Sequence, residues 1–360
     1  MEAALKLARQ YFLELDPPQP DRVHFIAREA SYHGNTLGAL AVSGHQGRRE
    51  KYEPLLSKNT SHVSAVYEYR GRDFATETSQ DYVARLVSEL DEEITRVGPH
   101  KVCAFVAEPV VGAAMACTVA PSGYFAAVKS VCEKHGALLI LDEVMCGIGR
   151  TGHMHAWQSP DVNVTPDLQT MGKGLGGGFI PISALLVGEK VNDALFTGTG
   201  SFTHGQTYQG HALACAGALA VQKIIKQDNL LSNVRMMGEK LFNDLGKALE
   251  NHPHVGDIRG CGLFLGLEIV EDKVTKQPFP SSLTIAERIS ELALDFDPDF
   301  GITVYPGTGT VNGLTGDHVI LAPPYNITQE DVDLIVRTTA ATVDAVTKEF
   351  SCAPRHHANP

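Results

Sequence analysis

Short apolar runs alternate with amphipathic stretches through the first half of this chain. Residues 23–27, 102–107 and 137–144 have the length and the β-branched content of buried strands, whereas 81–97 and 122–135 repeat apolar side chains at helical spacing, the latter after an expected Ser122 cap. Such alternation predicts an α/β fold with a doubly wound, mostly parallel sheet. Ligands of such sheets bind at the carboxyl ends of strands, which places Asp142 in the expected ligand zone.

The pattern changes near residue 228. Helices are predicted at 208–226 and 230–251, then an alternating strand at 262–270 and further helices at 282–296 and 329–346. We therefore predict a large domain over 1–227 and a smaller C-terminal α+β domain over 228–350. The polar end of the chain, 351–360, is expected to be disordered.

Composition narrows the function classes. The 30 Lys and Arg residues against 42 Asp and Glu residues give a net charge of −12, which argues against a nucleic-acid partner or an anionic membrane surface. No apolar run reaches the roughly 18 residues of a membrane span. The 7 cysteines are scattered without a C-x-x-C pair, and 153–155 (HMH) has no carboxylate or cysteine to complete a ligand set. We therefore expect no metal site, and we expect the protein to lie in the reducing environment of the cytoplasm.

One glycine-rich motif resembles a dinucleotide-binding site. Residues 147–152 (GIGRTG) fit the G-x-G-x-x-G dinucleotide fingerprint, follow a strand and precede Asp167 by about the right spacing. Asp142 and Glu143, however, end that strand and would repel a pyrophosphate. The following segment, 159–166, cannot form the helix whose N-terminus should bind phosphate. We therefore disfavour a dinucleotide site.

A lysine and an aspartate carry the chemistry. Lys173 stands among five glycines in 171–178 (MGKGLGGG) between apolar flanks, where desolvation would depress its pKa and make it a nucleophile able to form a Schiff base. The alternative is a glycine-rich turn with an incidental lysine. Asp142 ends an otherwise apolar strand and needs a cationic partner, although it could also cap the following loop. Val144, two residues on, is expected on the same strand face. An imine-forming lysine with an aspartate for a pyridinium nitrogen is the pairing that pyridoxal phosphate requires.

A series of ordered motifs extends this pairing. From Met1 to about Thr328 the chain resembles the class III (ω-type) pyridoxal-phosphate-dependent aminotransferases, enzymes of fold type I. The resemblance rests on 31–36 (SYHGNT), 108–109 (EP), 141–144 (LDEV) with 147–152, 170–174 (TMGKG), 204–208 (HGQTY) and 316–324 (GDHVILAPP).

The resemblance implies a role for each matching residue. Lys173 would form the Schiff base and then shuttle the proton, and Asp142 would contact the pyridinium nitrogen. Tyr32 would stack on one ring face and Val144 would lie beneath the other. Two further site residues are implied: His33, in the same motif as Tyr32, and Thr207, which would reach the cofactor phosphate of a neighbouring subunit. Glu108 and Arg150 match residues near the pocket, and each could instead belong to a structural ion pair.

These roles imply transfer of an amino group between an amine or ω-amino acid and a keto acid, in a homodimer with shared sites. A racemase, decarboxylase or aminomutase on the same fold is the alternative reaction. In the family a phosphate-binding loop precedes the helix that opens this chain, so we expect an N-terminally incomplete enzyme with reduced activity, or a non-catalytic dimerising remnant. Met145 and the arginine-free segment 304–307 do not favour ornithine- or GABA-like substrates.

Overall fold

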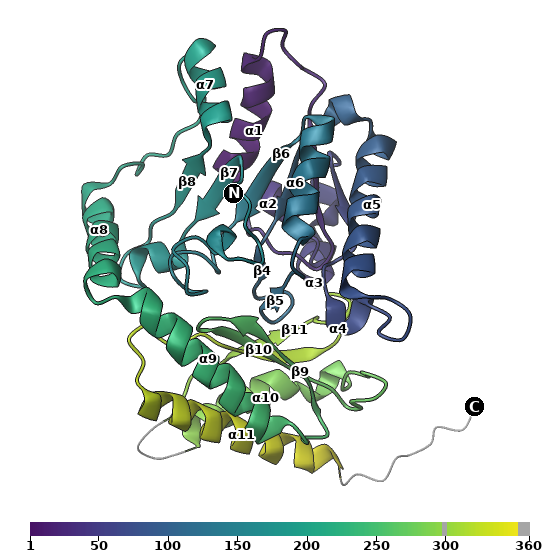
Figure 1. Ribbon diagram of the computed structural model, residues 1–360, viewed down its shortest axis with the longest axis vertical. Coiled ribbons are helices and arrows are strands. Elements are labelled where there is room, and N and C mark those ends of the chain that lie inside the picture. Colours follow the sequence, from purple (N-terminus) through teal and green to yellow (C-terminus); the bar gives the residue numbers. More distant parts are fainter. Residues whose placement is uncertain (297–300, 352–360) are drawn as a thin grey trace.

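A six-stranded sheet forms the centre of the fold in the computed structural model, which describes residues 1–296 and 301–351. The strand order is β2-β1-β3-β6-β7-β8; the first five strands run parallel and β8 antiparallel (Figure 1). The bounds are β1 His24–Arg28, β2 Thr60–Val63, β3 Val102–Ala107, β6 Leu138–Asp142, β7 Leu168–Met171 and β8 Ala184–Val187. The predicted mostly parallel α/β sheet is confirmed.

Helices cover both faces of this sheet because its central strands are apolar on both sides. Phe105 and Leu139 pack in one core cluster with α5 (Ser79–Val97) and α6 (Tyr124–His135). Val106 and Leu138 point the other way, into a cluster with α1 (Glu2–Glu14) and α7 (Glu189–Thr197). Alternate residues of a strand face opposite sides of a sheet, so continuous apolar runs need this double cover.

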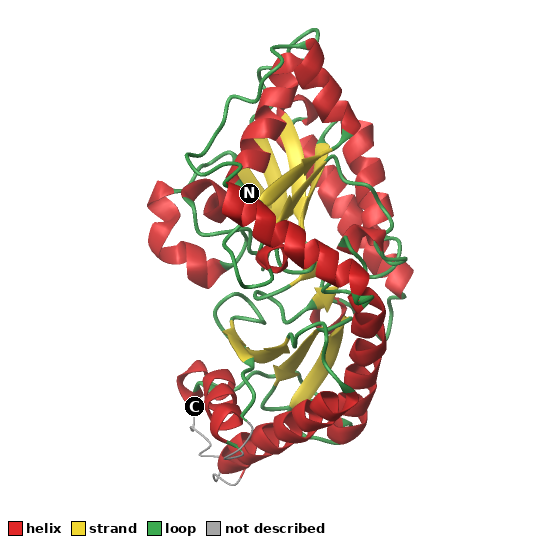
Figure 2. Ribbon diagram, turned by 90° about the vertical axis from the view of Figure 1, so that its left-hand side faces the viewer, coloured by secondary structure: helices red, strands yellow, loops and turns green. Residues whose placement is uncertain are grey.

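The C-terminal part is an antiparallel sheet with helices on one face. Its strand order is β11-β12-β10-β9. Figure 2 shows the strands of this smaller sheet below those of the large one, with helices beside and beneath them. The bounds are β9 Val255–Cys261, β10 Phe264–Ile269, β11 Tyr305–Thr308 and β12 Asp317–Leu321, with helices α9 Leu230–Leu249, α10 Ile285–Asp295 and α11 Gln329–Ser351. Helix α8, Ala212–Gln227, lies outside this layer and packs against the segment that follows β7. The shorter elements are α2 Leu37–Val42, α3 Gln46–Arg49, α4 Glu68–Gly71, β4 Val110–Val111 and β5 Thr118–Val119. In the described part of the chain, no helix is long and apolar enough to cross a membrane.

Several boundaries differ from those predicted. The strand predicted at 137–144 ends at Asp142, whose carboxylate accepts the Val144 N–H (3.1 Å) and turns the chain. Helix α6 is capped by Gly123 at φ 87° and not by Ser122. Helix α8 begins at Ala212, after the left-handed Gly210. The domain boundary at 227/228 stays a prediction, and the tail predicted at 351–360 lies outside the described residues from 352 on.

Arginines join the C-terminal sheet to the segments around the large sheet. Arg150 donates to the Leu263 and Pro323 carbonyls (3.0 and 2.6 Å) and lies 4.5 Å from the Tyr325 ring centroid. The resemblance leaves open whether Arg150 serves the pocket or the structure. These hydrogen bonds to backbone carbonyls are a structural role. The Glu268 carboxylate of β10, fully buried, lies 2.6 Å from Arg70 after β2 and is also paired with Arg259. These contacts fix how the two sheets meet.

A buried histidine should make stability fall in acid. His318 on β12 is fully buried, with Nδ1 2.5 Å from Thr310 Oγ1. Burial, reinforced by the positive charges of Arg259, His45 and Arg48, lowers its pKa to about 3. Above pH 6.5 the ring is neutral in both folded and unfolded chains. As the pH falls below 6.5, only the unfolded chain gains the proton, so stability is lost toward pH 3 by about 1.4 kcal/mol per pH unit.

The test compares His318→Gln with wild type by denaturant unfolding at pH 7 and pH 5. Wild type should lose about 2 kcal/mol more than the variant over this interval. His100→Gln, at an exposed position, is the matched control and should follow the wild-type profile. Parallel profiles for wild type and His318→Gln would contradict the assignment.

Candidate active site

Asp142 and Lys173 lie at the carboxyl ends of adjacent parallel strands. β6 ends at Asp142, which is aligned with Thr170 in β7. β7 ends at Met171, and Lys173 follows after one glycine. Two residues that the sequence separates are therefore brought to one edge of the sheet, where α/β folds bind ligands.

The Asp142 carboxylate is buried but fully supplied with donors. Oδ1 accepts hydrogen bonds from Thr170 Oγ1 (2.9 Å) and Val144 N (3.1 Å), and Oδ2 lies 2.9 Å from His33 Nδ1. Burial alone would raise the pKa of Asp142, but the contacts with His33 and the other donors outweigh it and hold the pKa below the ordinary aspartate value. The site therefore contains a permanent buried negative charge.

His33 is placed behind Asp142. Its ring is buried against the Oδ2 atom, and its backbone N–H donates to Ser43 Oγ (2.8 Å). The other ring nitrogen, Nε2, is buried and has no hydrogen-bond partner among the described residues. His33 was predicted as a cofactor-binding residue; the contact that the structure adds is with the carboxylate. Sequence reasoning missed this pair because 109 positions separate the two residues.

Lys173 has an unusual backbone and a depressed pKa. It opens a short 3₁₀ turn, Lys173–Gly176, at φ 41°, a left-handed conformation that costs on the order of 1–3 kcal/mol for a residue with a side chain. The residue is exposed on the open side of the site, yet the walls around it lower the pKa of its ammonium group, mainly by desolvation, and Arg48 lowers it further. The carboxylates of Asp142 and Glu108 act in the opposite direction.

Tyr32 is held in place by Glu108 and covered by Arg48. The Glu108 carboxylate accepts the N–H groups of Tyr32 and Gly112, both at 3.1 Å. Glu108 is buried, and burial raises the pKa of its carboxyl group. The Arg48 guanidinium carbon lies 4.1 Å from the Tyr32 ring centroid. The role of Glu108 in the structure is to fix the backbone of Tyr32, and sequence reasoning did not single out Arg48.

Val144 lies near Lys173, although not for the reason predicted. The strand ends before it, so strand alternation does not place its side chain. A β-carbon built on Gly172 would lie 3.5 Å from Val144 Cγ1, which puts the valine beside the residue that precedes Lys173. Packing after the turn at Asp142 brings the two together.

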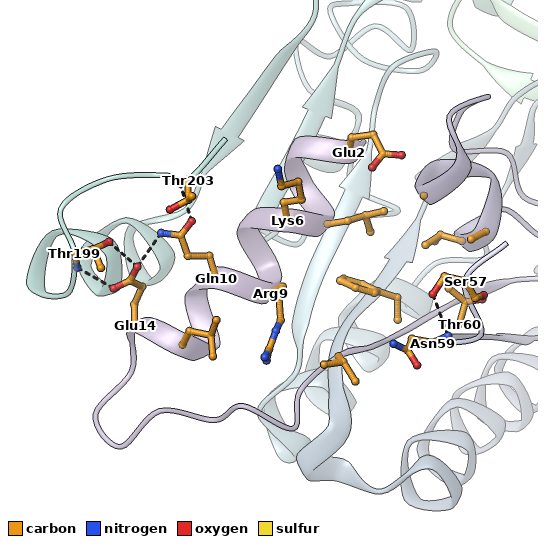
Figure 3. A pocket seen from close by; sticks show the side chains of 17 residues that line it. Glu2, Lys6, Arg9, Gln10, Glu14, Ser57, Asn59, Thr60, Thr199 and Thr203 are labelled. Atoms are coloured by element: carbon orange, nitrogen blue, oxygen red, sulfur yellow. Dashed lines mark hydrogen bonds between the residues drawn. The ribbon is translucent and has the colours of Figure 1, made fainter. Parts of the chain in front are cut away.

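Thr207 stands apart from the other six. It is exposed in the long segment between α7 and α8, and no hydrogen bond links it to the other predicted site residues in the described part of the chain. Side chains of α1 fix the start of this segment: Glu14 accepts from Thr199 N (2.8 Å) and Gln10 from Thr203 N (2.9 Å) (Figure 3). The same face of α1 borders a hollow of about 660 Å³ whose lining includes none of the predicted site residues.

The sequence model of the family described as Aminotransferase class-III matches residues 1–343. This chain belongs to the class-III aminotransferase family. An aminotransferase of Gibberella zeae is 52% identical to it over 337 residues, which are 93% of this chain and 65% of that relative. The chain thus spans just under two thirds of that relative's length.

Solved structures agree with the family. An (S)-enantioselective omega-transaminase from Thermomicrobium roseum superimposes with a TM-score of 0.86 at 36% identity, covering 96% of this chain and 72% of that one. An amine transaminase from an uncultivated Pseudomonas species, in its PLP-bound form, gives 0.86 at 32% identity and covers 96% of this chain and 74% of its own. The predicted fold type is therefore confirmed for this class-III aminotransferase.

The electrostatic link between Asp142 and Lys173 can be measured. Asp142→Asn removes a negative charge that holds the Lys173 proton, so the pKa of Lys173 should fall further and more neutral amine should be present at pH 8. Competitive acylation of Lys173 without cofactor, followed by mass spectrometry from pH 6 to 11, gives the midpoint. Asp161→Asn, at an exposed position, should leave it unchanged. An equal or higher midpoint in Asp142→Asn would refute the link.

Proposed function

We propose that this protein transfers an amino group between an amine or ω-amino acid and a keto acid with pyridoxal phosphate as cofactor. One observation carries the proposal: a buried Asp142 with a lowered pKa and a Lys173 whose pKa is also lowered stand at the ends of adjacent parallel strands. The family supports it as well, since its members are aminotransferases.

The residues present fit this cofactor. Asp142 has the charge to keep a pyridinium nitrogen protonated, and Lys173 supplies the amine for an aldehyde. Tyr32 and Val144 are an aromatic and a branched apolar side chain suited to the two faces of a flat ring. When bound, pyridoxal phosphate supplies an aldehyde for amines and a ring that accepts electrons from the substrate.

Lys173 and Asp142 divide the work. Because its pKa is lowered, the Lys173 amine is neutral in a larger fraction of molecules than a free lysine, so it can attack a carbonyl and afterwards take and return a proton. Asp142 stays ionised throughout because His33 and Thr170 remain bonded to it. Lys173 opens a 3₁₀ turn directly after the end of β7, so its backbone is held by regular structure on both sides. No contact in the described residues favours a racemase, a decarboxylase, an aminomutase or a non-catalytic remnant over this function.

The direct test is covalent capture of the cofactor. After incubation with pyridoxal phosphate, borohydride should attach the cofactor to Lys173 Nζ, as peptide mass spectrometry can show. Lys173→Ala should prevent attachment and lower amino transfer from an amine to pyruvate by at least about 10²–10⁴-fold, the contribution of a general acid–base group. Lys190→Ala, a lysine paired with Asp167 outside the site, is the control. Attachment at another lysine, or none, would refute the proposed role.

We also infer a homodimer. Large apolar side chains on and around α8 are exposed, and a large exposed apolar surface is typical of a protein–protein contact. They are Phe179 (90%), Tyr208 (80%), Leu213 (67%), Leu219 (55%) and Ile224 (50%). Helix α8 lies at the outer edge of the molecule, and Thr207 lies just before it (Figure 1). A partner on this surface would bury these side chains and would bring Thr207 to the neighbouring site.

Charge substitutions test this surface. Leu213→Asp combined with Leu219→Asp would bury two unpaired charges in a dimer, which costs several kcal/mol, so the variant should be monomeric by light scattering while wild type is dimeric. Val274→Asp, at an apolar residue that is also exposed (90%) but lies far from α8 in the sequence, should remain dimeric. A monomeric wild type, or a dimeric double variant, would overturn the inference.

A further inference from the structure

Arg48 is a partly buried arginine without a polar partner. Its guanidinium makes no hydrogen bond or ion pair with any residue in the described ranges 1–296 and 301–351. The guanidinium carbon lies 4.1 Å from the centroid of the Tyr32 ring. The adjacent Arg49 differs: it donates to the Leu40, Ala41 and Ser43 carbonyls and pairs with Glu53. One arginine of this pair is thus committed to the fold, and the other keeps its donors available.

The position of Arg48 is fixed from both sides. It belongs to α3 (Gln46–Arg49), which is attached to the turn between β11 and β12 by the hydrogen bond from Gly47 N to the Gly313 carbonyl (3.1 Å). On the other side, the Tyr32 backbone is bonded to Glu108. Contact with the Tyr32 ring places the guanidinium beside the aromatic residue of the proposed cofactor site.

The electrostatics near Arg48 favour an anion. The carboxylates closest to the site are engaged elsewhere, Asp142 by His33 and Glu108 by backbone N–H groups. Arg48 also acts on Lys173, lowering the pKa of that amine in addition to the larger effect of burial. A guanidinium partly removed from water without an acceptor loses solvation and gains most from a planar anion that can take two hydrogen bonds.

We propose that Arg48 binds the carboxylate of the keto-acid or amino-acid substrate, and thereby selects carboxylate-bearing partners over neutral carbonyl compounds. This rests on the proposed function, because it assigns a wall of the same site. A guanidinium can lie over an aromatic ring and still bind a carboxylate, because its N–H groups lie at the edge of its plane.

The experiment compares two acceptors of similar size, pyruvate and propanal, with 1-phenylethylamine as a donor that has no carboxylate. For Arg48→Gln, kcat/KM with pyruvate should fall about 10- to 100-fold through a rise in KM, which is the range for losing a hydrogen bond to a charged group. With propanal, the fall in kcat/KM should be smaller by a factor of about ten or more. Arg48→Lys keeps the positive charge but not the planar group that can donate two hydrogen bonds, so its kcat/KM with pyruvate should lie between those of wild type and Arg48→Gln. Lys51→Gln removes an exposed positive charge from the next turn and should match wild type. Equal losses for both acceptors would show that Arg48 only supports Tyr32 and would overturn the proposal.

A second readout does not need catalysis. With pyridoxal phosphate present, succinate, a carboxylate that cannot react, should raise the unfolding temperature of wild type and of Lys51→Gln but not of Arg48→Gln. If wild type transfers no amino group, the proposed function fails while the succinate shift still decides the role of Arg48. The proposal for Arg48 would be overturned if succinate gave no shift in wild type, or if it gave an equal shift in Arg48→Gln. It would also be overturned if Arg48→Gln bound pyridoxal phosphate more weakly, because the ligand of Arg48 would then be the cofactor phosphate.

Discussion

The buried charge of Asp142 is the constraint on which the site depends. A carboxylate inside the end of a sheet is costly unless every oxygen is bonded. Here the donors come from three separate segments: Thr170 from the neighbouring strand, Val144 from the turn after Asp142, and His33 from the segment after β1. The parallel register that aligns Asp142 with Thr170 also sets Lys173 beyond the end of β7. Satisfying one charge therefore assembles most of the site.

The same arrangement sets the balance of charge at the Lys173 amine. Desolvation and Arg48 favour the neutral amine, whereas Asp142 and Glu108 favour the ammonium. Glu108 is itself buried and resists ionisation, so Asp142 is the carboxylate that holds its charge most firmly. A cofactor nitrogen that pairs with Asp142 would weaken its pull on the Lys173 proton, and a substrate carboxylate on Arg48 would weaken the opposing effect. Binding at either end thus changes the reactivity of the amine between them.

Local sequence patterns predict Asp142 and Lys173 as site residues, and the structure brings these two to adjacent strand ends, but local patterns do not predict the residues that support them. Lys173 is marked by its glycines and Asp142 by the apolar run before it, signals contained within a few residues. The contact between His33 and Asp142 depends on the order of β1, β3 and β6 in the sheet, which no local pattern encodes. Strand alternation predicts Val144 on the same face as Asp142, and that reasoning fails because the strand ends at Asp142, where the carboxylate accepts the Val144 N–H. Thr207 stays a prediction, since its expected contact lies in another subunit.

The two parts of the chain contribute differently to the site. Asp142, Lys173 and Tyr32 all belong to segments around the parallel sheet, and the hydrogen bonds to Asp142 come from those segments as well. Arg48 also precedes that boundary in sequence, but its short helix is attached to the turn that ends in β12, through Gly313. The wall of the pocket that would select a substrate therefore depends on how the two sheets meet, which the contacts of Arg150 and Glu268 fix. Changes at that junction would therefore move Arg48, while Asp142 and Lys173 stay at the edge of the parallel sheet.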